Sequence, residues 1–478
     1  MEKLNRTTMP VAPLPVKVLQ FGEGNFLRGF ADWMIDVANE KGILHHGVSV
    51  IQPIEKGAAD LLEKQDGLYH VVLAGIRGGE YVRETRLVSC VQEAINPYAD
   101  YARYEQRILD PDLEFVISNT TEAGIRFDPE DDIFATPPRS FPGKVTAMLY
   151  KRFRHFNGAP GRGLDFLCCE LILSNGSALK RYVARYAKAY ELEPEFIEWV
   201  RNECRFYNTL VDRIVVGFPG DEIQEIREEI GYEDQLVVKG EQHHLWVISG
   251  PRWRVAQYSF PLDKAGLNVH FTKSYDSYRE KKVSILNGSH TAMAAVGQLM
   301  GCHTVKEAFE HPLVGAYVRK MVDEETLPQV PGDPAEARRF VEEVYDRFRN
   351  PGVCHKLQSI ALNAIPKWEV RNYPVVQRDR ELGILAKCHL FALAALMVIY
   401  SRSSNVIPDD TPSNIYFFRD YWSRDFPEWG IIYALESKSL WDIPPGSFLD
   451  VKQFTTGVTL KILAKGIETA LSDLIKER

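Results

Sequence analysis

The chain has 478 residues, 45% of them hydrophobic and 26% charged, a composition typical of globular proteins and a length sufficient for two domains. Its 57 basic and 65 acidic residues give a net charge of −8, which argues against nucleic acid or an acidic membrane surface as a partner. The opening residues lack the apolar run of a secretory signal, and the longest uncharged apolar run, residues 390–400, is about half of a membrane span.

We therefore expect a cytoplasmic protein, a monomer or weak homo-oligomer, with no membrane or nucleic-acid partner. The seven cysteines form no CxxC pair and show no spacing typical of a zinc site. They are interpreted as reduced thiols. The uncharged run of residues 390–400 is better explained as a buried helix than as a membrane segment.

The chain begins with the pattern of a strand, a glycine turn and a helix. Residues 16–21 (VKVLQF) predict a buried strand, and Gly22 and Gly24 follow at its tip. Glycines there allow the backbone to approach a pyrophosphate, to which the next helix N-terminus offers free amides. The third glycine of the usual fingerprint is missing, since Phe26 and Leu27 stand where it is expected. An ordinary tight turn is therefore the alternative to dinucleotide binding.

The next two features bear on the cofactor and on the sheet. The strand at residues 48–52 ends in Gln52, where many dinucleotide folds carry an acid against the ribose, and Glu55 follows only three residues later. Local sequence thus leaves NAD and NADP both open. Residues 68–76 and 81–91 predict an antiparallel insertion with a turn at Gly78 and Gly79.

Polar residues follow several later strands. The strand that starts near residue 114 is followed by Asn119, Thr120 and Glu122, at a strand end where open α/β sheets bind ligands. A buried strand near residues 165–169 leads to Asn175 in an Asn-Gly turn. That asparagine is either a ligand-binding amide or ordinary turn chemistry. Asp212 lies beside Arg213 in a further strand pattern, as an embedded charged pair.

From about residue 266 onward, helical patterns replace strands. We expect helices at residues 274–300, 304–324, 333–349, 351–364, 379–402, 411–425 and 457–476. The sequence therefore predicts a Rossmann-type α/β domain over residues 1–265 and a mainly helical domain over residues 266–478. A substrate would bind in the cleft between the two domains.

The helical domain opens with three side chains suited to alcohol oxidation. Lys282, Asn287 and His290 fall within one arc of about 140° if the segment is an α-helix. A lysine can take the hydroxyl proton, an asparagine amide can hold the developing oxyanion, and a histidine can orient the oxygen, without a metal. The lysine must then be desolvated or lie near another cation. The alternative is a solvated lysine beside a hydrogen-bonded core asparagine and histidine.

Two further cations stand in the second half of the chain. Lys367 and Arg371 are four residues apart and are neighbours if a helix resumes after Pro366. They could hold a substrate carboxylate, whereas the alternative is a solvated basic face.

Several motifs together resemble the mannitol dehydrogenase family of polyol-specific long-chain dehydrogenases. These are GEGNFLR after the first strand, FVISNTTEAG, CELILSNG, LVDRIV and above all KVSILNGSH. The similarity runs from about residue 16 to residue 470. Its most specific signal is a lysine, four residues, an asparagine, two residues and a histidine. Within the family the chain is most similar to the branch that acts on hexuronates.

The resemblance implies roles for particular residues. Lys282 would be the general acid and base, Asn287 and Asn175 would form the oxyanion hole, and His290 would contact the reacting oxygen. The dinucleotide would lie against Gly22, Gly24, Asn25, Phe26 and Arg28, with Asn119, Thr120 and Glu122 towards the nicotinamide. Asp212, Lys367 and Arg371 would contact the substrate.

The resemblance also implies the reaction. Glu170-Leu171 and Ala364-Ile365 depart from the residues common in polyol members, which argues against a simple mannitol substrate. We expect NAD-dependent, metal-independent and reversible reduction of D-tagaturonate to D-altronate. The alternatives are oxidoreduction of fructuronate/mannonate or of mannitol/fructose, or an NAD(H)-sensing protein that has lost the chemistry. Against the last alternative stands the complete trio of Lys282, Asn287 and His290.

Overall fold

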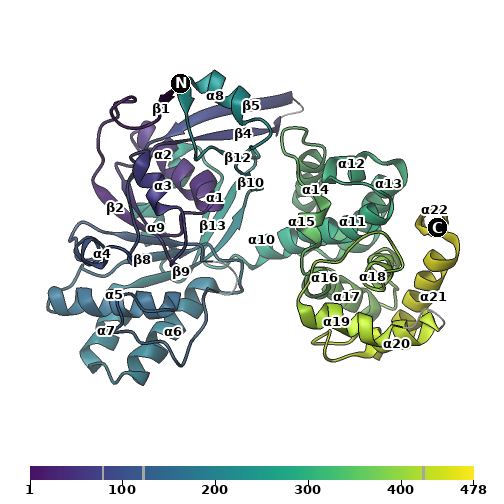
Figure 1. Ribbon diagram of the computed structural model, residues 1–478. Coiled ribbons are helices and arrows are strands. Elements are labelled where there is room, and N and C mark those ends of the chain that lie inside the picture. The colour runs from purple at the N-terminus through teal and green to yellow at the C-terminus, as the bar shows by residue number, and fades with distance from the viewer. Residues whose placement is uncertain (78–79, 121–123, 423–425, 478) are drawn as a thin grey trace. The chain divides into compact units, whose positions relative to one another are not determined.

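The computed structural model describes all residues except 78–79, 121–123, 423–425 and 478 (Figure 1). The chain divides into two compact units, Met1–Tyr275 and Asp276–Arg478. The sequence placed the boundary between residues 265 and 266, ahead of a strand, Val269–Thr272, that the structure assigns to the sheet of the first unit.

Within the described residues of unit 1, eight strands form the main sheet in the order β14-β13-β9-β8-β7-β2-β3-β6. The strands from β6 to β9 in this order are parallel to their neighbours, and β13 is antiparallel to β9. The order reverses at β2 and β7, the switch point at which open α/β sheets bind their ligands. The predicted Rossmann-type fold is therefore confirmed. The strands are β2 Val16–Phe21, β3 Gly47–Ile51, β6 Val91–Ile95, β7 Phe115–Ser118, β8 Asp165–Cys168, β9 Arg205–Asp212, β13 Leu245–Ser249 and β14 Val269–Thr272.

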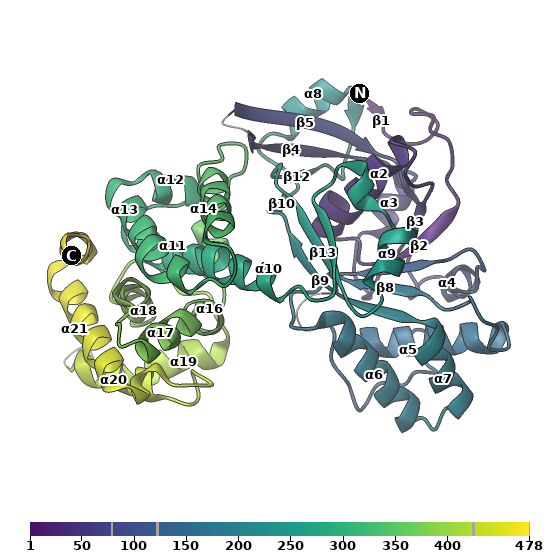
Figure 2. The ribbon, with the colours of Figure 1, turned by 180° about the vertical axis from the view of Figure 1, so that it is seen from behind.

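Helices cover both faces of this sheet, as Figures 1 and 2 show from opposite sides. One face is packed by a core that includes Phe21, Phe141 and Phe196, and the other by a core that includes Phe30 and Trp246. Strands buried on both faces explain the continuous apolar runs of the sequence. The helices of the first core are α4 Tyr101–Ile108, α5 Phe141–His155, α6 Asn175–Ala189 and α7 Pro194–Glu203, and those of the second include α2 Trp33–Glu40, α3 Ala59–Lys64 and α9 Trp253–Ser259.

The predicted antiparallel insertion is present as β4 (Tyr69–Arg77) and β5 (Glu80–Val88), which pair in register from Tyr69–Val88 to Arg77–Glu80. Two details differ from the prediction. The second strand is shorter, because residues 91–95 leave it to become β6 of the main sheet. The insertion also gains β12 (Val238–Gly240), parallel to β4, and β10 (Val215–Gly217), antiparallel to β12. The predicted turn at Gly78 and Gly79 lies outside the described residues.

Unit 2 is helical throughout its described part, around a core centred on α18 (Lys387–Tyr400). Nearly every residue of α18 is buried, which confirms that the long apolar run is a core helix. Among the described residues, none of the helices has the length and apolarity needed to cross a membrane. The other helices are α10 Asp276–Lys281, α11 Gly288–Leu299, α12 Val305–Glu310, α13 Pro312–Lys320, α14 Pro334–Phe348, α15 Leu357–Ala361, α16 Ala364–Arg371, α17 Tyr373–Glu381, α19 Pro412–Tyr421, α20 Pro427–Glu436, α21 Leu449–Lys465 and α22 Ile467–Lys476.

The predicted helix boundaries in unit 2 are wrong at several places. Residues 304–324 divide into α12, α13 and η4 (Met321–Thr326), and residues 379–402 into the end of α17 and α18. Residues 457–476 belong to two helices, because Gly466 takes a left-handed φ of 80° that ends α21. The segment 351–364 contains only the short α15, and α20 was not predicted at all. In two segments, η3 (Lys282–Asn287) and η4 (Met321–Thr326), the helix is of the π type, with a widened turn.

Candidate active site

The glycine turn after β2 has the shape that the sequence predicts. Gly22 has a φ of 123°, and a Cβ there would lie 3.1 Å from the carbonyl oxygen of Asn119, so a larger residue would be strained. Gly24 caps the helical stretch that begins at Asn25, and a Cβ on Gly24 would meet open space. The backbone at Gly24 can therefore be approached closely by a ligand, as a pyrophosphate requires.

The buried side chain of Arg28 binds residues of this turn. Its side chain is 6% exposed and donates from Nε to the Glu23 carbonyl (3.0 Å), from Nη1 to the Leu236 carbonyl and from Nη2 to Asn25 Oδ1 (2.6 Å). Phe26 stacks on Phe30 with ring centroids 4.9 Å apart. Arg28 thus binds the protein's own backbone, and its predicted contact with the pyrophosphate stays a prediction.

A buried polar network beneath the turn was not predicted from the sequence. Gln20 Nε2 donates to the Gly22 carbonyl (3.1 Å) and to Asp32 Oδ2 (3.3 Å), and the Tyr69 hydroxyl donates to the same carboxylate oxygen (2.8 Å). Asp32 is 0% exposed, and burial raises the pKa of its carboxyl to about 7. The only sequence signal was an acidic residue at an otherwise apolar helix position.

The raised pKa of Asp32 predicts a pH-dependent stability. Because the folded state holds this proton more tightly than the unfolded state, stability falls as pH rises from about 4 to about 7. Between pH 5 and pH 8, this group should remove roughly 2 to 3 kcal/mol from the free energy of unfolding. Asp32→Asn should lack that loss. Urea unfolding of both proteins at the two pH values measures this loss. An equal change in the free energy of unfolding with pH in the two proteins would contradict the raised pKa of Asp32.

The ends of β7 and β8 are joined by Glu170, a residue noted in the sequence only as a departure from the family pattern. Its carboxylate accepts from Ser118 Oγ (3.1 Å), from the Thr120 amide (3.1 Å) and from Thr120 Oγ1 (3.0 Å). Glu170 is 2% exposed, and burial raises the pKa of its carboxyl. It fixes the strand end that carries Asn119 and Thr120, both of which are half-buried. Glu122 lies outside the described residues.

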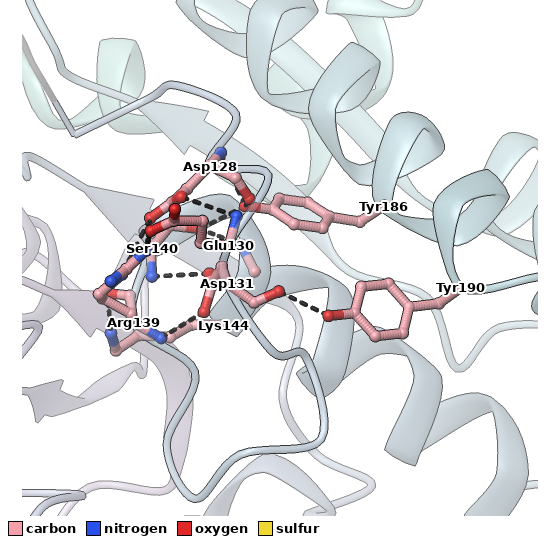
Figure 3. Close-up of polar contacts among 9 residues, drawn as sticks. Asp128, Glu130, Asp131, Arg139, Ser140, Lys144, Tyr186 and Tyr190 are labelled. Carbon is pink, nitrogen blue, oxygen red and sulfur yellow. Dashed lines mark hydrogen bonds and ion pairs between the residues drawn. The ribbon is translucent and has the colours of Figure 1, made fainter.

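Residues 124–140, which lead into α5, contain a polar cluster that is shown in Figure 3. The Asp131 carboxylate accepts from the backbone amides of Arg139 and Ser140, both at 2.7 Å. Lys144 is 2% exposed and donates to the Arg139 carbonyl (2.8 Å), and burial lowers the pKa of its amine to about 8. The hydroxyl of Tyr190, the residue that follows α6, donates to the Asp131 carbonyl (2.6 Å). These contacts hold the segment against α5 and α6, which cover one face of the main sheet.

Asn175 occupies a fully buried position at the start of α6. Its Nδ2 donates to the carbonyls of Cys168 (2.9 Å), Glu170 (3.0 Å) and Thr209 (3.0 Å), and its Oδ1 accepts from the amides of Gly176 and Thr209, both at 2.9 Å. Its exposure is 0%. The side chain therefore ties the ends of β8 and β9 together. Its role in an oxyanion hole stays a prediction, and both amide hydrogens are already engaged by backbone carbonyls.

Asp212 and Arg213 are both buried at the end of β9. Arg213 donates to the carbonyls of Gly29 (2.7 Å) and His243 (3.1 Å) and lies 4.2 Å from the ring centroid of Trp33. Asp212 Oδ2 lies 3.6 Å from His243 Nε2. The arginine thus connects β9 to the helix of the glycine turn.

In unit 2, Lys282, Asn287 and His290 lie in one continuous helical stretch. Lys282 is 7% exposed and His290 6%, while Asn287 is half-buried, so the lysine is not a solvated surface side chain. Residues 282–287 are π-helical, so the angles of a regular α-helix do not apply to the trio. π-Helical turns are frequent at functional sites. The His290 ring packs against Phe348, with centroids 4.8 Å apart.

Lys367 and Arg371 lie on α16, which packs against α11. Arg371 Nη1 donates to Thr291 Oγ1 (3.2 Å), next to His290 in the chain, and Lys367 Nζ donates to the Ile360 carbonyl (3.0 Å). Both side chains are half-buried. The structure therefore brings Arg371 close to the helix of the trio.

Comparison with known proteins agrees with this architecture. Residues 16–259 match the mannitol dehydrogenase Rossmann domain, and residues 274–416 match the mannitol dehydrogenase C-terminal domain. An altronate oxidoreductase of Phocaeicola vulgatus is 41% identical over 448 residues, 92% of this chain and 93% of that protein. One of Bacillus subtilis is 41% identical over 427 residues, 89% of this chain and 88% of that protein.

Solved structures share the fold at lower identity. The mannitol 2-dehydrogenase of Pseudomonas fluorescens, solved with NAD and D-mannitol, has a TM-score of 0.79 and 21% identity and covers 100% of both chains. A D-sorbitol dehydrogenase in substrate-free form has a TM-score of 0.78 and 18% identity, over 98% of this chain and 100% of that one. From the two matched domains and these relatives, the chain belongs to the mannitol dehydrogenase family.

Proposed function

We propose that this protein catalyses the NAD-dependent, reversible reduction of D-tagaturonate to D-altronate, with a lysine as general acid and base and without a metal ion. The observation that carries the proposal is the helical stretch with buried Lys282 and His290 and half-buried Asn287, in a chain of this family. The named reaction rests on relatives called altronate oxidoreductase, about 41% identical over some nine-tenths of the chain.

The glycine turn fits the cofactor. Gly24 offers open space and free helix amides to a pyrophosphate, and Asn119 and Thr120 stand at the switch point of the sheet, where the nicotinamide is expected. When bound, NADH supplies the hydride. The protein's part is to position the ketone and to handle its proton and charge.

Each member of the trio has one task in this scheme. In reduction, Lys282 gives its proton to the ketone oxygen, and in oxidation it takes the hydroxyl proton back. The Asn287 amide donates a hydrogen bond to the oxygen as negative charge develops, a contact typically worth about 3 kcal/mol in the transition state. His290 orients the same oxygen.

The substrate carboxylate would be held by cations, for which Lys367 and Arg371 are the candidates, with Asp212 as a further substrate contact. Arg371→Met should raise KM for hexuronates about 10- to 100-fold, the worth of a charge-assisted hydrogen bond, and leave KM for fructose nearly unchanged. Thr291→Val is the matched control, because it removes the Thr291–Arg371 contact but keeps the guanidinium. An equal rise in KM for hexuronates and for fructose would contradict a carboxylate contact.

The reaction is tested by following NADH oxidation at neutral pH with D-tagaturonate, D-fructuronate and D-fructose side by side. The same panel is run with NADPH and after treatment with a chelator. We expect turnover of tagaturonate to exceed the others, with NADH preferred and no effect of the chelator. A preference for fructuronate or fructose would reassign the substrate, and NADH binding without turnover on any of them would favour a sensor.

A further inference from the structure

We propose that Asn372 and His389 are positioning residues that hold the first turn of α11, the turn that carries His290, in its working place. This inference rests on the function proposed above. Asn372 Nδ2 donates to the carbonyl of Gly288 (3.1 Å) and to Nδ1 of His389 (3.0 Å). Both side chains are 0% exposed.

The hydrogen-bond chain has only one consistent direction. The Gly288 carbonyl can only accept, so the amide NH2 group of Asn372 faces it, and the second amide hydrogen points to His389 Nδ1. That nitrogen must then be unprotonated, and Nε2 carries the hydrogen that is donated to Thr326 Oγ1 (3.0 Å). Burial lowers the pKa of the imidazole to about 3, so the ring is neutral at physiological pH, as this direction requires.

His389 is itself anchored from other elements. The Glu325 carboxylate in η4 accepts from the backbone amides of Cys388 (2.7 Å) and His389 (3.0 Å), at the start of α18. The indole of Trp368 in α16 donates to the His389 carbonyl (3.2 Å). Thr326, the last residue of this series of hydrogen bonds, is also 0% exposed. The imidazole thus has a fixed place from which to hold Asn372.

The contact lies where a small movement would matter for catalysis. Gly288 follows Asn287 and precedes His290 by two residues, and a Cβ on Gly288 would lie 3.3 Å from the Arg371 carbonyl. The helix passes close to α16 there, and the Arg371–Thr291 hydrogen bond adds a second contact one residue beyond His290. A shift of this turn would move the Asn287 amide and the His290 ring together, and a misplacement of about 1 Å can cost about 100-fold in rate.

Two variants of one residue separate positioning from simple packing. His389→Asn keeps an acceptor two bonds from Cβ, where Nδ1 stands, and loses the contact to Thr326. His389→Gln keeps a donor three bonds from Cβ, where Nε2 stands, and loses the acceptor for Asn372. We expect His389→Gln to lower kcat for tagaturonate reduction about 10- to 100-fold with KM for NADH unchanged, and His389→Asn to stay within about threefold of the wild type.

Hydrogen exchange of the peptide covering residues 284–292 gives a readout independent of turnover. Faster exchange in His389→Gln than in His389→Asn is expected, because only the former releases the Gly288 contact. Equal kcat and equal exchange in the two variants would overturn the proposal. If one variant fails to fold, Asn372→Leu against Thr326→Val replaces the pair, with loss expected only in the former. An inactive wild type would refute the proposed reaction, while the exchange comparison would still decide whether the network holds the turn.

Discussion

Lys282→Met is expected to lower turnover of the ketone by about 10²- to 10⁴-fold, the usual worth of a general acid or base in the transition state. Methionine keeps the unbranched, buried shape of the side chain but has no proton to give. Because the glycine turn lies in unit 1, NADH binding should be retained. Steady-state kinetics with tagaturonate and a fluorescence titration with NADH measure the two quantities separately.

The neighbouring Lys281 provides the matched control. Its amine pairs with Glu336 and lies 5.3 Å from the ring centroid of Tyr278, so it belongs to a local surface contact. Lys281→Met removes the same charge one residue away and should leave kcat within about twofold, since its partner Glu336 is 52% exposed and ion pairs at the protein surface have small effects. Equal losses in the two variants, or unchanged turnover in Lys282→Met, would contradict the assigned role of Lys282.

Asn175→Ala is expected to destabilise unit 1 by about 3 to 5 kcal/mol. The change leaves the buried carbonyls of Cys168, Glu170 and Thr209 without the amide that now serves them, and unpaired buried polar groups are costly. Asn287→Ala, at a half-buried position, should cost less than about 1 kcal/mol in stability but lower kcat about 10²- to 10³-fold. Thermal unfolding measures the loss of stability in both variants, and steady-state kinetics measure the loss of kcat.

This comparison decides between two roles for Asn175. The resemblance to the family places it in the oxyanion hole beside Asn287, whereas its contacts in the structure make it a clamp between β8 and β9. A stable Asn175→Ala protein with lost turnover would restore the catalytic role. A protein that melts earlier, with turnover retained below its melting temperature, would establish the clamp.

Local patterns were sufficient for much of the fold. The apolar runs predicted β2, β3, β7 and β8 to within a residue or two, because strands buried on both faces leave a continuous hydrophobic signal. The glycines at 22 and 24 placed the turn correctly, since its backbone conformation depends on residues adjacent in sequence. Side chains suited to alcohol chemistry at helical spacing indicated Lys282, Asn287 and His290, and the family motif pointed to the same three residues.

What the sequence could not predict depends on distant partners or on small changes of helical pitch. The pairing of β12 with β4 joins segments far apart in the chain, and the network of Gln20, Asp32 and Tyr69 forms only after folding. The switch to a π-helix at Lys282 leaves no periodic signature, because a single widened turn does not change the spacing of apolar residues noticeably. Asn372 and His389 give no signal in the sequence for the same reason as Asp32, since each is an isolated polar residue whose partners lie elsewhere in the chain.

The central claim is tested most directly by the fate of the hydride. The purified protein is incubated with D-tagaturonate and NADH in which both hydrogens at C4 of the dihydronicotinamide are replaced by deuterium, and the product is analysed by mass spectrometry and NMR. We expect one deuterium on the carbon that was the ketone of tagaturonate, in product identified as D-altronate, and almost no product from the Lys282→Met protein. Product without deuterium on that carbon, or no product from the wild-type protein, would contradict it.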